Sequence, residues 1–199
     1  MTLHEQRLEA VTQRLLASGA TSVLDLGCGD GELMARLAML EQFERIVGID
    51  ISADALAGAR RVLDLGPDAG DGRVSLMHAS FTVADRRLWG FDAAALVETI
   101  EHVDPDRLSL VERAVFGCYR PRTVVVTTPN EEYNVLHGMR PGALRHPDHR
   151  FEWSRTKFRR WALGVGKRNG YALAFDDVGE VDPALGASTQ MAVFTCSQQ

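Results

Sequence analysis

Two glutamates and a histidine lie within five positions of one another in the stretch VETIEHV, residues 97–103. If residues 98–102 form one helical turn, Glu98, Glu101 and His102 share a face, because positions i, i+3 and i+4 do so. Two crowded carboxylates repel each other unless a cation lies between them. Two carboxylates and an imidazole suit Mn²⁺, Fe²⁺ or Zn²⁺, and they suit Mg²⁺ less well because of the histidine. The stretch therefore predicts a divalent-metal site, and the alternative is an acidic surface turn that begins the next helix.

Two more histidines lie in the stretch RHPDHRFEW, residues 145–153. It belongs to a segment, residues 131–153, that has no clear periodicity, and a segment of that length in a compact domain is usually functional or disordered. His146 and His149 follow a predicted strand, so they can reach the same edge of the sheet as the glutamates. One of them can complete a site of two glutamates and two histidines, or one can accept a proton there. A solvated loop histidine is the alternative for each.

Strands and helices that could position these residues alternate along the chain. Such alternation predicts a parallel sheet with helices on both faces, and the final helix–strand–loop–strand order allows a terminal antiparallel strand. We expect one α/β domain over residues 1–199. The predicted helices span residues 3–17, 30–40, 53–65, 104–119 and 154–170, and the predicted strands span residues 22–26, 45–50, 73–80, 91–97, 122–130, 171–176 and 190–196.

A glycine-rich turn follows the first predicted strand in the stretch VLDLGCGDG, residues 23–31. Glycines let the backbone turn tightly and approach a ligand closely. Asp25 and Asp30 flank the turn, which disfavours a pyrophosphate and suits a cationic or zwitterionic ligand. Asp50 ends the second strand, where a carboxylate can hold both ribose hydroxyls. A dehydrogenase is the alternative, but GCGDGE fails the Gly-x-Gly-x-x-Gly pattern.

The stretches LDLGCGDG and GIDIS resemble the first and second motifs of class I S-adenosylmethionine-dependent methyltransferases. The resemblance implies a Rossmann-like, mostly parallel seven-stranded sheet with a terminal antiparallel strand, and S-adenosylmethionine as cofactor. It implies that Gly27 and Gly29 pass beneath the methionine part of the cofactor and that Asp50 holds the ribose. It also implies that Ile51 packs on the adenine and that Ala79, Ser80 and Phe81 edge the adenine pocket.

The charge of the chain is unevenly distributed around a net charge of −5. Residues 139–170 hold nine basic and two acidic side chains, whereas the residues on either side are acidic overall. Such a segment is a candidate footprint for an anionic partner, with a solvated helix face as the alternative. No apolar run approaches the roughly 20 residues that span a bilayer, and the N-terminus lacks a signal-peptide core. We therefore expect a cytoplasmic protein with no membrane partner. The three cysteines, Cys28, Cys118 and Cys196, are expected to be buried free thiols.

Three stretches together resemble the HUA ENHANCER-type small-RNA 2′-O-methyltransferases: the Glu-x-x-Glu-His pattern after the fourth strand, TTPNEEYN after the fifth, and DHRFEWSRTKFRRWA. The resemblance covers roughly residues 8–196. It implies methyl transfer to the 2′-hydroxyl of the 3′-terminal nucleotide of RNA. It also implies that Glu98, Glu101, His102 and His149 bind Mn²⁺ or Mg²⁺. His149 is preferred over His146 because it lies in the DH-x-FEW part of the motif.

An RNA substrate gives the basic segment a role, because arginine contacts with phosphates add affinity with little sequence preference. We expect Arg140, Arg145 and Arg150 to contact the RNA together with Asn130, and Tyr133 or Trp153 to stack on a base unless they are packing anchors. The resemblance to the bacterial members of this family also suggests an RNA-repair kinase–phosphatase–ligase as partner. The alternatives are a metal-dependent O-methyltransferase acting on a small vicinal diol or catechol, and a binding module without enzymatic activity.

Overall fold

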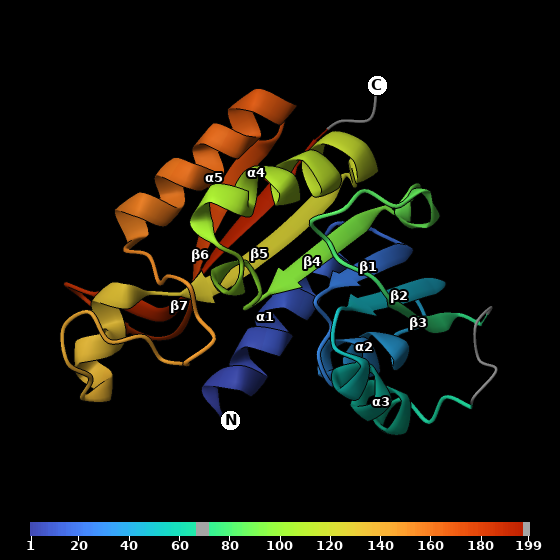
Figure 1. Ribbon diagram of the computed structural model, residues 1–199, viewed down its shortest axis with the longest axis horizontal. Helices are drawn as coiled ribbons and strands as arrows, with labels where there is room; N and C mark the ends of the chain where they lie inside the picture. The colour runs from blue at the N-terminus through green and yellow to red at the C-terminus, as the bar shows by residue number, and fades with distance from the viewer. Residues whose placement is uncertain (67–71, 197–199) are drawn as a thin grey trace.

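The computed structural model describes residues 1–66 and 72–196. Within these residues the chain forms a seven-stranded sheet in the order β3–β2–β1–β4–β5–β7–β6 (Figure 1). The strands are β1 (Ser22–Leu26), β2 (Arg45–Asp50), β3 (Val74–His78), β4 (Ala93–Val97), β5 (Thr123–Pro129), β6 (Ala172–Asp182) and β7 (Gly186–Thr195). Strands β1 to β5 are parallel, and β7 is antiparallel to both of its neighbours. The predicted α/β class and its terminal antiparallel strand are confirmed.

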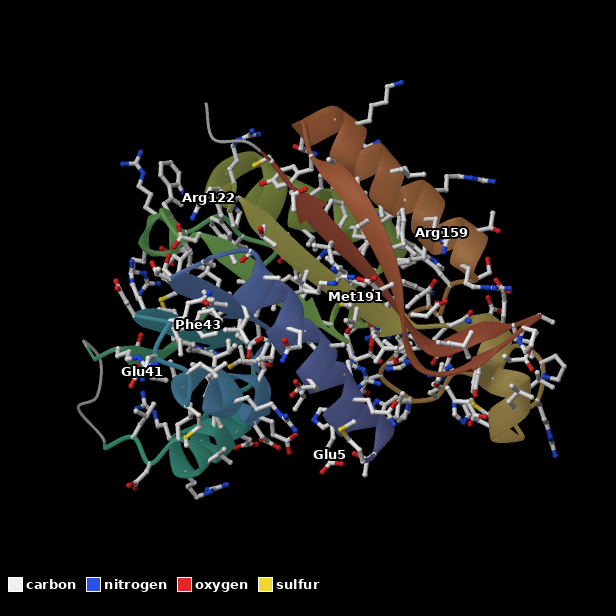
Figure 2. The ribbon with its side chains drawn as sticks, turned by 180° about the vertical axis from the view of Figure 1, so that it is seen from behind. Glu5, Glu41, Phe43, Arg122, Arg159 and Met191 are labelled. Carbon is white, nitrogen blue, oxygen red and sulfur yellow. The ribbon has the colours of Figure 1, made fainter. Side chains whose placement is uncertain are left out.

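Helices cover both faces of the sheet (Figures 1 and 2). One face carries α1 (Leu3–Ala17), α2 (Glu32–Ala38) and α3 (Ala53–Val62), whose buried side chains include Leu8, Met34 and Leu56. The other face carries α4 (Leu108–Val111), the π-helix η4 (Glu112–Tyr119) and α5 (Arg155–Asn169), which bury Phe116 and Phe158 among others. The sheet therefore separates two apolar cores, and its carboxyl edge is left open for a site.

Helix α1 lies across the back of the sheet, as Figure 2 shows. Its start is fixed by a capping box, in which Thr2 Oγ1 accepts from Glu5 N at 3.2 Å and Glu5 Oε2 accepts from Thr2 N at 2.6 Å. Such reciprocal bonds satisfy two backbone donors that a helix start leaves free. The helix therefore begins at a defined residue and presents its buried face, which includes Arg7, to the sheet.

One predicted helix and two predicted strands differ clearly from the structure. The helix expected over residues 104–119 is a 3₁₀ turn η3 (Pro105–Arg107), a short α4 and the π-helix η4. Phe116 and Tyr119 on this π-helix are both buried in the core. The last two strands are longer than predicted, because a tight connection joins Asp182 to Gly186 and the polar residues of β6 lie at the open edge of the sheet.

The segment over residues 131–153 is ordered. It starts with a 3₁₀ helix, η5 (Glu131–His137), for which Asn130 Oδ1 accepts from Glu132 N at 3.0 Å and Gly138 ends the helix with a positive φ of 71°. Short 3₁₀ helices also span η1 (Arg86–Leu88) and η2 (Ile100–His102). None of the helices in the described part of the chain is long and apolar enough to cross a bilayer.

Candidate functional site

A cleft of about 680 Å³ opens at the carboxyl edge of the sheet. In a doubly wound sheet, ligands bind outside the carboxyl ends of the strands. The cleft brings together most of the predicted cofactor residues and two of the predicted metal ligands. These lining residues are Gly27, Gly29, Asp50, Ile51, Ser80, Phe81, Glu98 and His102. A second hollow of about 320 Å³ shares Gly27, Gly29 and Glu98 with the cleft and is also lined by Asp25.

The glycine-rich turn between β1 and α2 forms the floor of the cleft. Gly27 has a φ of 83°, and a Cβ atom on it would lie 2.6 Å from Thr99 Cγ2. Only glycine fits such a position without moving its neighbours. The amides of Gly27 and Cys28 both donate to Ile49 O, at 2.8 and 2.9 Å, so the turn is tied to the end of β2. The backbone therefore passes close beneath the cleft, as the prediction for Gly27 requires.

Asp50 is held at the end of β2 by two backbone donors. Its Oδ2 accepts from Gly29 N at 3.0 Å, and its Oδ1 accepts from Ser52 N at 2.8 Å. Each oxygen keeps a lone pair that can accept from a ligand hydroxyl. Ile51, next to it, exposes 70% of its surface although it is apolar, and it lines the cleft. A polar anchor beside an uncovered apolar side chain suits a nucleoside.

Asp25 is buried in β1 with 2% exposure. Burial raises the pKa of this carboxyl to about 7, and the neighbouring charge of Asp50 adds to the shift. The acid lies directly before the glycine-rich turn, so a cationic ligand in the adjoining hollow would favour its ionised form.

Glu98 directly follows β4 and has a strained backbone conformation, with a φ of 52°. Its amide donates to Thr127 O at 3.2 Å and to Thr127 Oγ1 at 3.1 Å, which fixes this backbone reversal. The prediction that residues 98–102 form one helical turn is therefore wrong: a 3₁₀ turn spans only Ile100–His102. The Oε2 atom of Glu98 lies 3.1 Å from Nη2 of Arg7 on α1.

Glu101, His102 and His149 form a cluster in which one potential ligand atom from each residue lies within 4.8 Å of the others. Glu98, the fourth predicted ligand, is not part of that cluster and pairs with Arg7 instead. Among the described residues, Glu98 Oε1 and Glu101 Oε1 are buried without a hydrogen-bond donor. Buried oxygens of this kind are costly unless a cation or donor satisfies them, so the residues present fit a divalent ion.

The ionisation of the two glutamates is consistent with this fit. Burial raises the pKa of Glu98, although Arg7 opposes the shift. Burial and the charge of Glu98 raise the pKa of Glu101 well above its usual range. Burial, followed by the neighbouring histidines, lowers the pKa of His102, which favours the neutral imidazole that ligates metals. A bound cation would stabilise the ionised forms of these two carboxyl groups and so oppose the rise in their pKa.

The two loop histidines lie beside this cluster. The ring of His149 lies 4.8 Å from that of His102 between centroids, and the ring of His146 lies 6.1 Å from it. His149 Nδ1 bonds Glu152 Oε1 at 2.6 Å, whereas the side chain of His146 is 54% exposed. The fold thus places both histidines beside the site: His149 is hydrogen-bonded to Glu152, and His146 is exposed.

The predicted RNA-binding residues divide into exposed and enclosed side chains. Arg140 and Arg150 are exposed. Asn130 is fully buried, Tyr133 is 8% exposed, and Arg145 donates to protein acceptors. That these residues contact RNA stays a prediction, and the enclosed ones have structural partners of their own. Trp153 is 4% exposed and stacks on Phe151 with ring centroids 4.2 Å apart, as the packing alternative expects.

Sequence reasoning missed two residues that touch the site. Arg7 lies on the buried face of an amphipathic helix together with Leu8 and Val11, and a charge on an apolar face was the signal that could have found it. Glu152 lies in the FEW part of the quoted motif, three residues after His149. Its side chain is fully buried, and it accepts a hydrogen bond from that histidine.

Comparison with known proteins agrees with this fold. The methyltransferase domain family matches residues 23–122, and the fold is that of a class I methyltransferase domain. Within that class, the chain belongs to the Hen1 family of small RNA 2′-O-methyltransferases. It is 39% identical over 203 residues to the small RNA 2′-O-methyltransferase of Mus musculus, covering 97% of this chain and 51% of that protein.

Two solved structures are similar over the whole of this chain. The methyltransferase domain of a bacterial Hen1 protein, CtHen1, is 41% identical with a TM-score of 0.87, covering 98% of this chain and all of that one. The structure of the small RNA methyltransferase HEN1 is 31% identical with a TM-score of 0.89, covering 100% of this chain and 27% of that one. The chain spans about half the length of the mouse and rat relatives that it matches.

Proposed function

We propose that this protein transfers a methyl group from S-adenosylmethionine to the 2′-hydroxyl of the 3′-terminal nucleotide of RNA, with the help of Mn²⁺ or Mg²⁺. The observation that carries the proposal is that Glu98 and His102 line the same cleft as Asp50 and Phe81. The candidate ligands thus lie next to the candidate cofactor site, where a methyl group and its acceptor oxygen would meet. The names of the relatives supply the substrate.

Four side chains would hold the ion: Glu98, Glu101, His102 and His149. When bound, a divalent ion lowers the pKa of a hydroxyl and orients it as a nucleophile. A 3′-terminal nucleotide offers two adjacent hydroxyls as ligands, whereas an internal nucleotide lacks the free 3′-hydroxyl. This difference accounts for the choice of a 3′ end without reading the base sequence.

His146 is the candidate proton acceptor, because its ring lies 5.7 Å from that of His149 without sharing its buried partners. One residue cannot easily ligate a metal and act as a base at the same time, so His149 is assigned to the ion. His146 Nδ1 accepts from Asp148 N at 3.2 Å. For Nδ1 of His146 to accept a proton, its hydrogen bond from the Asp148 amide must first break.

Exposed cations of the basic segment support an RNA substrate over a small molecule. Arg150 is exposed and lines the cleft, Arg140 is exposed in the same segment, and α5 adds an outer face with Lys157, Arg160 and Lys167 exposed. Phosphates bound by such side chains add affinity that falls steeply with salt. A small catechol or vicinal diol could use the same metal chemistry but has no use for these cations. A role beside a repair kinase–phosphatase–ligase stays a prediction from the sequence.

The deciding experiment uses radiolabelled S-adenosylmethionine and one short RNA prepared with a 2′,3′-diol, a 3′-phosphate or a 2′-deoxy end. Each is assayed with Mn²⁺ and with a chelator, and a small catechol is assayed in parallel. Label only in the diol RNA and only with metal is the expected result. Label in the catechol but in no RNA would favour the small-molecule reading.

Variants assign the chemistry to the site. Glu101→Gln and His102→Ala are expected to lose methyl transfer while they keep S-adenosylmethionine binding, measured by calorimetry. Glu131→Gln, an exposed glutamate at the start of η5, is the matched control and should behave as the parent. Transfer that persists in both site variants at saturating metal would remove the metal from the proposal.

A further inference from the structure

We infer that Glu152 is a positioning residue for the metal site: it fixes the tautomer and the orientation of His149, so that Nε2 of this histidine faces the ligand cluster. The inference deepens the proposed function and rests on its metal site. Glu152 needs no contact with the ion, because it would act through His149.

The carboxylate of Glu152 is buried, and both of its oxygens accept hydrogen bonds. Its side chain has 0% exposure. Oε1 accepts from His149 Nδ1 and from Arg145 N, each at 2.6 Å, and Oε2 accepts from Asn134 Nδ2 at 2.6 Å. The bond from Arg145 joins the two ends of the loop over residues 145–152, the bond from His149 lies within that loop, and the bond from Asn134 ties the loop to η5.

The chemistry of a carboxylate decides which nitrogen of His149 carries the proton. An ionised carboxylate only accepts hydrogen bonds, so Nδ1 must be the donor. In a neutral imidazole this leaves the lone pair on Nε2. His149 belongs to the cluster with Glu101 and His102, whose ligand atoms lie within 4.8 Å. The tautomer that Glu152 selects is therefore the one in which Nε2 can ligate.

Arg145 anchors this arrangement to the sheet. Its Nε donates to Asn134 Oδ1 at 2.6 Å, its Nη2 to Asn130 O at 2.8 Å, and its Nη1 to Ser188 O at 3.0 Å. Asn130 follows β5 and Ser188 lies in β7, so Glu152 is held by the sheet and not only by its own loop. The histidine is thereby oriented before an ion binds.

The carboxylate also adds charge behind the ligand. A histidine that donates its other N–H to a carboxylate is a more basic ligand, and loss of such a partner typically lowers metal affinity about 10–100-fold. The guanidinium of Arg145 places a positive charge beside this carboxylate, since its Nε lies 3.9 Å from Glu152 Oε2. Orientation and charge can be separated, since glutamine keeps an accepting oxygen but loses the charge.

The test measures Mn²⁺ affinity of the purified full chain from the free-ion signal in electron paramagnetic resonance. Glu152→Gln should bind Mn²⁺ roughly 10-fold more weakly, and Glu152→Ala roughly 100-fold more weakly. Both should keep the parent's affinity for S-adenosylmethionine, measured by calorimetry. Glu131→Gln, in the same segment but exposed, should bind Mn²⁺ as the parent does. If Glu152→Ala does not fold, the glutamine variant carries the test.

A double-mutant cycle separates positioning from a general structural role. In a His149→Ala background, adding Glu152→Gln should cause no further loss of Mn²⁺ affinity, because Glu152 acts through the missing ring. A further loss equal to that in the parent background would overturn the inference. A folded Glu152→Gln protein with unchanged Mn²⁺ affinity would do the same. If the parent itself binds no Mn²⁺, the metal site of the proposed function fails first, and the inference fails with it.

Discussion

The guanidinium of Arg7 on α1 lies 3.1 Å from the Oε2 atom of Glu98 at the end of β4. The two side chains are 11% and 18% exposed, and Arg7 Nη2 also donates to Thr189 Oγ1 on β7 at 3.1 Å. The N-terminal helix thus places a fixed positive charge beside a candidate metal ligand. Burial raises the pKa of Glu98, and the positive charge of Arg7 opposes that shift, so Arg7 lowers the cost of an ionised carboxylate at this position.

Arg7→Met is expected to lower the free energy of unfolding by about 3 kcal/mol, because removal of one partner leaves a buried charge unpaired. Mn²⁺ should then raise the melting temperature more in the variant than in the parent, since the ion becomes the cation nearest Glu98. Thermal unfolding with and without Mn²⁺ measures both effects.

Arg36→Met is the matched control for Arg7→Met. Arg36 pairs with Glu9 of α1 at 3.4 Å, but the two side chains are 36% and 46% exposed. Loss of an exposed pair should cost less than about 1 kcal/mol. An Arg7→Met protein with the parent's stability, or with a smaller response to Mn²⁺, would show that Glu98 does not depend on Arg7.

Asp25 predicts a pH dependence of stability. Its pKa is about 7 in the folded protein, because burial raises it from 3.8, so the folded state holds this proton more tightly than the unfolded chain. The free energy of unfolding should fall as the pH rises from about 4 to about 7 and should then level off. One pKa unit corresponds to about 1.4 kcal/mol.

Asp25→Asn removes the titrating group and should flatten that pH dependence by a few kcal/mol in total. Chemical denaturation at pH 5 and at pH 7.5 measures the difference. Asp30→Asn, an exposed acid in the same turn, should keep the parent's profile. Equal slopes in the parent and in Asp25→Asn would mean that Asp25 is already ionised in the folded protein.

The local patterns of the sequence predicted the scaffold, since the alternation of strands and helices indicated a mostly parallel sheet. Gly27, Asp50 and Ile51 line the cleft at the carboxyl edge of that sheet, and their roles toward a cofactor stay predictions. Helical spacing failed at Glu98, because hydrogen bonds to Thr127 on the neighbouring strand reverse the backbone there. Pairings across long sequence separations leave no periodic trace in a single sequence.

The same limit explains the residues that sequence reasoning missed or placed differently. Arg7 and Glu98 form an ion pair although 91 positions separate them in the sequence, so neither residue predicts the other. Arg145 has the charge expected of a phosphate ligand, but its partners Asn130 and Ser188 come from β5 and β7 and become neighbours only in the fold. Composition predicted that residues 139–170 carry a net positive charge, but it did not predict which of their basic side chains are exposed and which are enclosed by the fold.

Gly27→Ala should weaken S-adenosylmethionine binding at least about 10-fold. A Cβ at this position would lie 2.6 Å from Thr99 Cγ2, and the φ of 83° would be strained as well. Gly29→Ala is the comparison within the same cofactor turn: no protein atom lies within 4 Å of its Cβ, so it tests the positive φ of 52°, which costs about 1–2 kcal/mol, without a contact to Thr99. Calorimetry with S-adenosylmethionine measures both variants.

A second change tests whether the contact or the backbone conformation decides the loss at Gly27. Thr99→Ser removes the methyl group that the new Cβ would meet, so the Gly27→Ala/Thr99→Ser protein should recover part of the affinity. If Gly27→Ala and Gly29→Ala lose affinity equally, and Thr99→Ser restores nothing, backbone strain explains the whole effect.

The exposed and enclosed arginines of the basic segment should respond differently to substitution. Arg150→Ala and Arg140→Ala should each weaken RNA binding and lower the slope of log affinity against log salt by about 0.7, as for one phosphate contact with a single strand. The stability of these variants should stay near the parent's. The ion pair of Arg150 with Asp104, at 3.6 Å, joins two exposed side chains, and such pairs contribute little.

Arg145→Ala should instead lower the melting temperature, because its loss leaves the enclosed Asn134 Oδ1 without its donor and removes one donor each from Asn130 O and Ser188 O. Arg87→Ala, an exposed arginine in η1, controls for the loss of one positive charge anywhere on the surface. Fluorescence titrations of a short RNA at several salt concentrations, beside thermal unfolding, separate the two groups. If Arg150→Ala and Arg87→Ala give the same salt slope as the parent, the RNA does not follow the surface around Arg150.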